Sequence, residues 1–91
     1  MKQPESTISL RDLPNIGETL TALLNEAGIN SPEELYENGI FQAFLRIRAI
    51  DPGACFSKLC ALEGAIEGIR WHNLSREKKV ELKHFFSLAN K

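Results

Sequence analysis

The 91-residue sequence contains no apolar run approaching the roughly 20 residues that cross a bilayer. Its opening stretch, MKQPESTISL, also lacks the apolar core of a signal peptide. These two absences argue against a membrane protein and predict a cytoplasmic one.

Cysteine is scarce too. Cys55 and Cys60 are the two present, which is too few for a disulfide-rich fold. On one helix their side chains would point about 140° apart, so two reduced, packed thiols are expected.

Groups that enzymes and metal sites use are also missing. His72 and His84 lack the spacing of a metal-binding pair, and no third ligand stands near them in the sequence. Neither cysteine has a neighbouring base that would make it a nucleophile. The sequence therefore predicts a protein that is not an enzyme and that needs no metal or other cofactor.

What is present is typical of one ordinary globular domain. A chain of 91 residues has room for one core, and its apolar share of 43% and charged share of 25% are those of a folded protein. The net charge of −1 hides an asymmetry. Residues 1–45 carry two basic and seven acidic side chains, whereas residues 46–91 carry nine basic and five acidic ones. The first half is therefore acidic and the second half basic.

Helix signals recur along the whole chain, and no stretch alternates as a strand would. Gly28 provides a helix stop, Ser31 begins a capping box, and the segment Asp51-Pro52-Gly53 breaks the chain again. The expected helices cover residues 17–27, 32–38, 40–50 and 54–69, and the segment Asn73-Leu74-Ser75 opens a fifth. The predicted fold class is all-α: a compact five-helix domain at residues 10–91, with the third and fourth helices at its centre, after a polar tail at residues 1–9.

The turn LPNIG, residues 13–17, is the first candidate site. Its backbone N–H groups at Asn15, Ile16 and Gly17 precede a helix N-terminus, an arrangement that attracts phosphate. The same turn also serves simply to join two helices at a sharp angle. Acidic neighbours at Asp12 and Glu18 favour this second interpretation.

The basic second half supplies another candidate surface. It could meet a phosphate backbone, with Trp71 available to stack on a base. Acidic residues alternate with these cations on the last helix, which is also typical of a solvated helix face. The candidate basic residues are Arg70, Arg76, Lys78, Lys79 and Lys83.

A stripe of small residues marks one face of the 54–69 helix. Glycine within a helix costs about 1 kcal/mol relative to alanine, so its repeated use points to a close approach by a neighbouring backbone. That neighbour is either another segment of this domain or a partner chain. The stripe consists of Ala61, Gly64, Ala65 and Gly68.

Taken in order, the segments LPNIGETLTALLNEAGI, SPEEL, DPGACFSKLCALEGAIEGIRWHNL and KKVELKHFF resemble the C-terminal domain of the TfoX (Sxy) family of bacterial competence regulators. The resemblance covers about residues 10–90. It implies a fold related to helix-hairpin-helix or SAM-like domains. It also implies a role in regulating DNA transformation genes together with a cyclic-AMP-responsive activator. Full-length members carry an additional N-terminal α/β domain. The sequence shows no such domain, so this domain is expected to stand alone.

Two mechanisms follow for such a regulatory module. As a protein-interaction module it would contact a basic partner through its acidic half, or any partner through the small-residue stripe. A transcription factor and a protein resembling the N-terminal domain are the expected partners.

As a DNA-binding module, the domain would instead use the LPNIG turn and the basic residues. The charge of the first half favours protein contacts, because it repels phosphates within a Debye length of about 8–10 Å. Transcription regulation through DNA remains the alternative, and the oligomeric state stays open.

Overall fold

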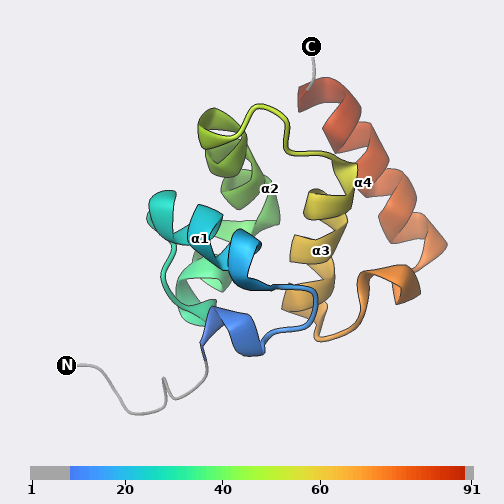
Figure 1. Ribbon diagram of the computed structural model, residues 1–91. Coiled ribbons are helices and arrows are strands. Elements are labelled where there is room, and N and C mark those ends of the chain that lie inside the picture. Colours follow the sequence, from blue (N-terminus) through green and yellow to red (C-terminus); the bar gives the residue numbers. More distant parts are fainter. Residues whose placement is uncertain (1–8, 90–91) are drawn as a thin grey trace.

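The computed structural model describes residues 9–89, and Figure 1 shows how their helices are arranged. Four α-helices follow one another: α1 (Glu18–Glu26), α2 (Pro32–Ile50), α3 (Phe56–Glu67) and α4 (Arg76–Ala89). Two short 3-10 helices, η1 (Leu10–Asp12) and η2 (Trp71–Asn73), precede α1 and α4. This part of the chain contains no strand, which confirms the predicted all-α class. The expected tail at residues 1–9 lies outside the described residues apart from Ser9.

The predicted number of five helices is wrong, because the second and third expected helices form one kinked helix. Gly39 lies inside α2 with φ of 79° and ψ of 158°, a backbone conformation that side chains rarely allow. Helical conformation resumes at Ile40, with no connecting loop between the two parts. The glycine therefore bends the helix rather than ending it, and α2 runs for 19 residues.

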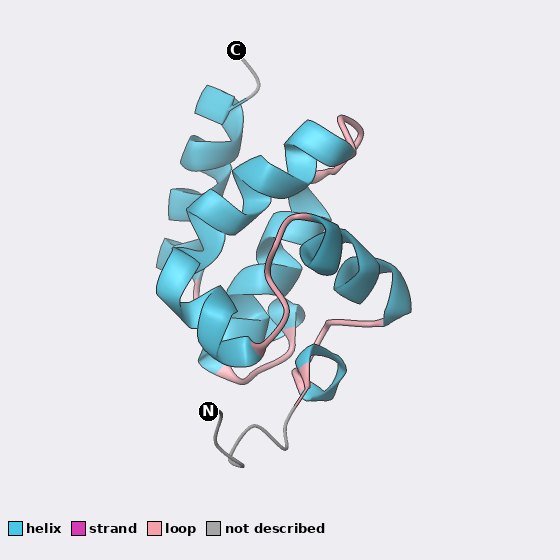
Figure 2. Ribbon diagram, turned by 90° about the vertical axis from the view of Figure 1, so that its left-hand side faces the viewer, coloured by secondary structure: helices cyan, strands magenta, loops and turns pink. Residues whose placement is uncertain are grey.

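Helix α3 lies between α1 and α4 in Figure 1, and α2 packs behind it. The view in Figure 2 shows the same helices joined by short loops. The most deeply buried large side chains come from all four helices and meet around α3 and the second half of α2. They include Leu24 of α1, Phe44 and Ile47 of α2, Leu62 of α3 and Leu82 of α4. This core places the third and fourth expected helices at the centre, as predicted.

Aromatic side chains join α4 to the rest of the molecule. Phe86 of α4 contacts Phe44 of α2 at a ring-centroid distance of 5.9 Å and Phe56 of α3 at 5.6 Å. Phe85 stacks on Phe41 of α2 with centroids 4.3 Å apart. Within the described residues, no helix is both long and apolar enough to cross a membrane.

Candidate functional site

A groove of about 690 Å³ opens where the LPNIG turn crosses α3. One wall is formed by this turn and the start of α1, over Asn15 to Leu20. The facing wall carries Ser57, Lys58 and Ala61 of α3, and Arg70 and Trp71 complete the lining. The groove therefore brings together segments from both halves of the chain.

Asn15 holds the two sides of this groove together. Its φ of 70° lies in the left-handed region, which asparagine tolerates better than most side chains. Its Nδ2 donates to the carbonyl of Ile69 at 2.9 Å and, more weakly, to that of Ala61 at 3.5 Å. Its Oδ1 accepts from the backbone N–H of Trp71 at 3.1 Å. The side chain thus binds the first turn to the end of α3 and the start of η2.

Gly64 provides the space for this contact. A Cβ atom at this position would lie 2.5 Å from Asn15 Nδ2 and 2.7 Å from the carbonyl oxygen of Ile69. Real side chains essentially never approach so closely, so only glycine fits here. At Gly64, therefore, the backbone that packs closely against the small-residue stripe belongs to the same chain.

The other stripe residues have different surroundings. Ala61 is buried at the groove wall, and Ala65 is buried in the core. Gly68 is exposed and ends α3 in the left-handed conformation with φ of 79°. The structure therefore brings Ala61, Gly64 and Ala65 together along α3, and Gly68 is the cap residue that follows the helix.

The start of α1 presents backbone N–H groups to the groove. Gly17 is the cap residue and has no side chain to accept hydrogen bonds from the amides that follow. The first amides of a helix have no partner within the helix, and the helix dipole makes this end positive. Glu18 also lines the groove and brings one negative charge to it. The residues Glu18, Thr19 and Leu20 thus line the groove, and their amides lack a partner within α1.

Two cations flank these amides from different elements. Lys58 extends from α3, and Arg70 precedes η2. Within residues 9–89 neither forms an ion pair. Sequence reasoning missed Lys58, although its position three residues before Ala61 places it on the same face of α3 as the small-residue stripe.

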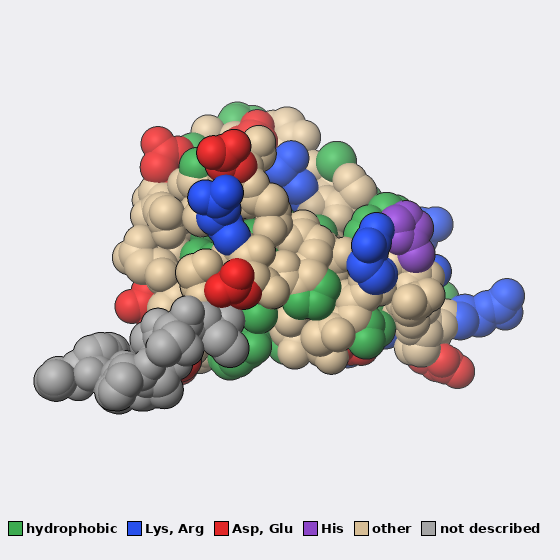
Figure 3. All heavy atoms as spheres, turned by 60° about the horizontal axis from the view of Figure 1, so that its bottom comes forward, with side chains coloured by type: hydrophobic (Ala, Val, Ile, Leu, Met, Phe, Trp, Pro, Cys, Tyr) green, Lys and Arg blue, Asp and Glu red, His purple; other side chains and the backbone are tan. Residues whose placement is uncertain are grey.

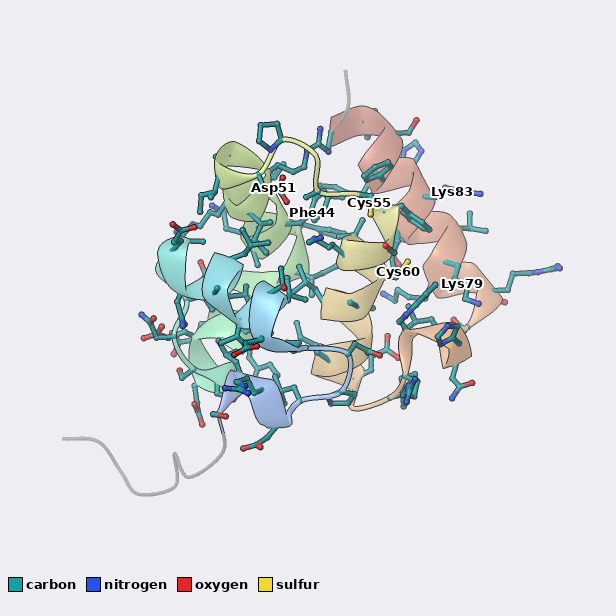
Figure 4. All side chains as sticks on the ribbon, in the orientation of Figure 1. Phe44, Asp51, Cys55, Cys60, Lys79 and Lys83 are labelled. Atoms are coloured by element: carbon teal, nitrogen blue, oxygen red, sulfur yellow. The ribbon has the colours of Figure 1, made fainter. Side chains whose placement is uncertain are left out.

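The remaining candidate basic residues lie on α4 and do not line the groove. Lys78 pairs with Glu81 at 3.0 Å and lies 3.9 Å from Glu63. Lys79 Nζ donates to the carbonyl of His72 at 3.3 Å. Figure 4 shows Lys79 and Lys83 on α4, on the opposite side of α3 from α1. The structure therefore places Arg70 in the groove and Arg76, Lys78, Lys79 and Lys83 on a separate helix.

The two thiols have different environments. Cys60 is buried, and this burial raises the pKa of its thiol. Cys55 is exposed at the start of α3, which corrects the expectation that both thiols are packed. Its sulfur lies 3.1 Å from Ser57 Oγ, and this hydrogen bond lowers the pKa of the Cys55 thiol. Both cysteines are free, as expected.

Glu63 is a charged side chain buried between α3 and α4. Burial, and then a hydrogen bond with Glu67, raise its pKa to about 7, and the positive charge of Lys78 only partly offsets them. The folded protein therefore holds this proton more tightly than the unfolded chain does. The resulting stabilisation is fully present below about pH 4.5 and is lost as the pH rises through 7.

We expect Glu63→Gln to raise the free energy of unfolding by about 1 kcal/mol at pH 8 and to change it little at pH 5. This figure is well below the full effect of the pKa change, because the substitution also removes the attraction to Lys78. Urea unfolding at both pH values measures it. Glu37→Gln is the control, since Glu37 is exposed on α2 and belongs to neither ion pair of Lys78, so this substitution should change the free energy of unfolding little at either pH. An equal effect of Glu63→Gln at both pH values would contradict the prediction.

Comparison with known proteins places the chain among relatives of similar size. A crystal structure of an uncharacterised Listeria monocytogenes protein in a triclinic form has a TM-score of 0.89 and 49% identity, over 91% of this chain and 94% of that one. A tetragonal form of a L. monocytogenes protein of unknown function gives a TM-score of 0.84 and 51% identity, over 87% and 98%. No similar protein is found among curated proteins.

The family comparison agrees with the resemblance seen in the motifs. The model of the TfoX C-terminal domain matches residues 6–86, which include the LPNIG turn, the small-residue stripe and all of α1, α2 and α3. The match covers nearly the whole chain, and the chain therefore belongs to the TfoX C-terminal domain family.

Proposed function

We propose that this chain is a regulatory module of the competence-regulator kind, without enzymatic activity, and that it binds nucleic acid through the groove. One observation carries the proposal: Lys58 and Arg70 flank the same groove as the uncapped amides at the start of α1. Two cations and a helix N-terminus facing one space are the chemistry that recognises phosphate. Membership of a regulatory family supports the absence of catalysis.

A DNA hairpin with a single-stranded tail tests the proposal, because this probe offers both forms of DNA at once. We expect binding at about 50 mM salt that weakens clearly at 200 mM, with a logarithmic salt slope of about −2 for two phosphate contacts. Fluorescence anisotropy measures the affinity. No binding at the lower salt would overturn the proposal.

Substitutions then locate the site. Lys58→Ala and Arg70→Ala should each weaken binding about five- to tenfold and reduce the salt slope by about 1, since each removes one phosphate contact. Arg76→Ala is the matched control, because Arg76 is exposed and does not line the groove. Binding that survives the first two changes, or that is lost equally with the third, would exclude the groove as the site.

A protein contact is the second candidate function, favoured by exposed apolar side chains on α2 and α4. Phe41 is 36% exposed, although it stacks on Phe85. Leu45, one turn after Phe41, is 45% exposed, and Leu88, three residues after Phe85, is 55% exposed. These side chains form an apolar surface along the contact of the two helices.

The purified N-terminal domain of a two-domain family member is the partner to test for this surface. Sedimentation should show a complex that Leu45→Ser weakens and that Val80→Ser leaves unchanged, since Val80 lies about two turns before Leu88 and about 140° around α4 from Phe85. Absence of a complex would remove this second candidate.

A further inference from the structure

We infer that the groove selects single-stranded over duplex nucleic acid, by seating one unpaired base against Trp71 and the apolar groove floor beside the phosphate contacts. This inference rests on the proposed function and names the class of nucleic acid that the same site takes.

The charge distribution is poorly suited to a duplex. Proteins that bind duplex DNA without sequence preference rely on many phosphate contacts, about 6–10 for strong binding. Here Lys58 and Arg70 are the basic residues that line the groove, Glu18 opposes them, and the net charge of the chain is −1. On the face seen in Figure 3, basic and acidic side chains are interspersed and form no continuous basic stripe. Phosphate contacts must therefore be supplemented by another interaction.

The lining of the groove supplies that interaction. Its volume of about 690 Å³ is far more than one phosphate group needs and lies within the usual range of about 300–1,000 Å³ for small-molecule sites. Ile16, Leu20 and Ala61 line the groove, each of them almost fully buried, and the half-buried Trp71 lines it beside them. An apolar floor beside two cations matches the chemistry of a nucleotide, which has a flat base and a charged phosphate.

The aromatic part of the groove is held in place before any ligand arrives. The Trp71 N–H donates to Asn15 Oδ1, which fixes the backbone at the groove wall. The imidazole of His72 stacks on the indole with ring centroids 4.2 Å apart. His72 covers one face of the indole and Trp71 also packs against the core, so a base has to contact the indole surface that remains exposed. An aromatic platform held in this way loses little freedom on that contact. In a duplex the bases are already stacked and paired, so this platform is available only to an unpaired base.

Three probes of equal phosphate number test the inference: a fluorescent oligothymidine, a blunt hairpin duplex, and an abasic strand that has the same backbone without bases. We expect oligothymidine to bind about tenfold more tightly than either of the others, the size of effect expected from stacking one base. Trp71 is the single tryptophan of the chain, so its fluorescence reports stacking without any substitution. Oligothymidine should quench it, and the abasic strand should not.

The outcomes separate the two proposals. Equal affinity for all three probes would overturn this inference and leave nucleic-acid binding by the groove in place. Tight binding of oligothymidine without quenching would also overturn it, because no base would then lie on Trp71. Lack of binding to any probe, including the tailed hairpin, would overturn both. As a control, Arg76→Ala should leave the preference and the quenching unchanged.

Discussion

Replacing Gly64 with alanine is expected to lower the free energy of unfolding by about 3 kcal/mol, a large fraction of the stability of a domain of this size. The new Cβ would lie 2.5 Å from Asn15 Nδ2, 2.7 Å from the Ile69 carbonyl oxygen and 3.2 Å from the Cα of Trp71. Two of these three atoms belong to the backbone, so they cannot move aside by a side-chain rotation. The gain of about 1 kcal/mol that alanine offers within a helix is too small to offset this overlap.

Gly53→Ala is the matched control for this prediction. Its Cβ would meet Asp51 Oδ1 at 3.5 Å, an ordinary contact distance, in the loop before α3. We expect a change within about 0.5 kcal/mol. Chemical denaturation followed by circular dichroism measures both variants. A Gly64→Ala protein as stable as the Gly53→Ala protein would show that the turn and α3 separate easily.

Asn15→Ala is expected to lower the free energy of unfolding by about 2–3 kcal/mol. It leaves the Ile69 carbonyl and the Trp71 N–H without their side-chain partner, at about 1 kcal/mol for each hydrogen bond. It also places alanine at φ of 70°, which adds about 1 kcal/mol of strain. Asn15→Gly separates the two causes, because glycine adopts this φ freely and lacks only the hydrogen bonds. The glycine variant should therefore be the more stable of the two.

The same position links stability to the groove. Without Asn15, the Trp71 backbone loses its hydrogen-bond partner. Asn15→Gly should therefore also weaken binding of the tailed hairpin and speed up amide hydrogen exchange at Trp71.

The double variant with Asn15→Gly and Gly64→Ala tests the contact between these two residues. It should lower the free energy of unfolding by less than the sum of the two single changes, because Asn15→Gly removes one of the atoms that the new Cβ meets. Additive free energies would contradict the proposed contact.

The extent to which the site could be predicted differs from residue to residue. The LPNIG turn was predicted as a phosphate site or a corner from its glycine and its place before a helix. The structure shows the side chain of Asn15 joining the corner and the Ile16 N–H donating to the Leu13 carbonyl at 3.4 Å, while the residues after Gly17 line the groove. Arg70 was included within a basic group whose other members lie on α4. Lys58 was overlooked because its neighbours in the sequence, Ser57 and Leu59, give no sign of the turn that faces it.

The fold shows a similar division. Ser31 accepts a hydrogen bond from the Glu34 N–H at 3.2 Å, so the start of α2 was predicted from local capping chemistry. The kink at Gly39 was predicted as a helix end, because glycine marks both features equally well. Four of the apolar residues that follow it are buried in the core, and this packing sustains the helix beyond the kink. They are Ile40, Ala43, Phe44 and Ile47.

The sequence by itself determined the all-α class, the positions of most helix ends and the family, because capping, turn chemistry and apolar periodicity act over a few residues. Only the tertiary structure decided that Asn15, Gly64 and Trp71 meet. The hydrogen bonds of Asn15 join residues 54 and 56 positions apart. Such pairings depend on how the whole core packs, and no local pattern specifies them. The groove that Lys58 and Arg70 both line exists for the same reason.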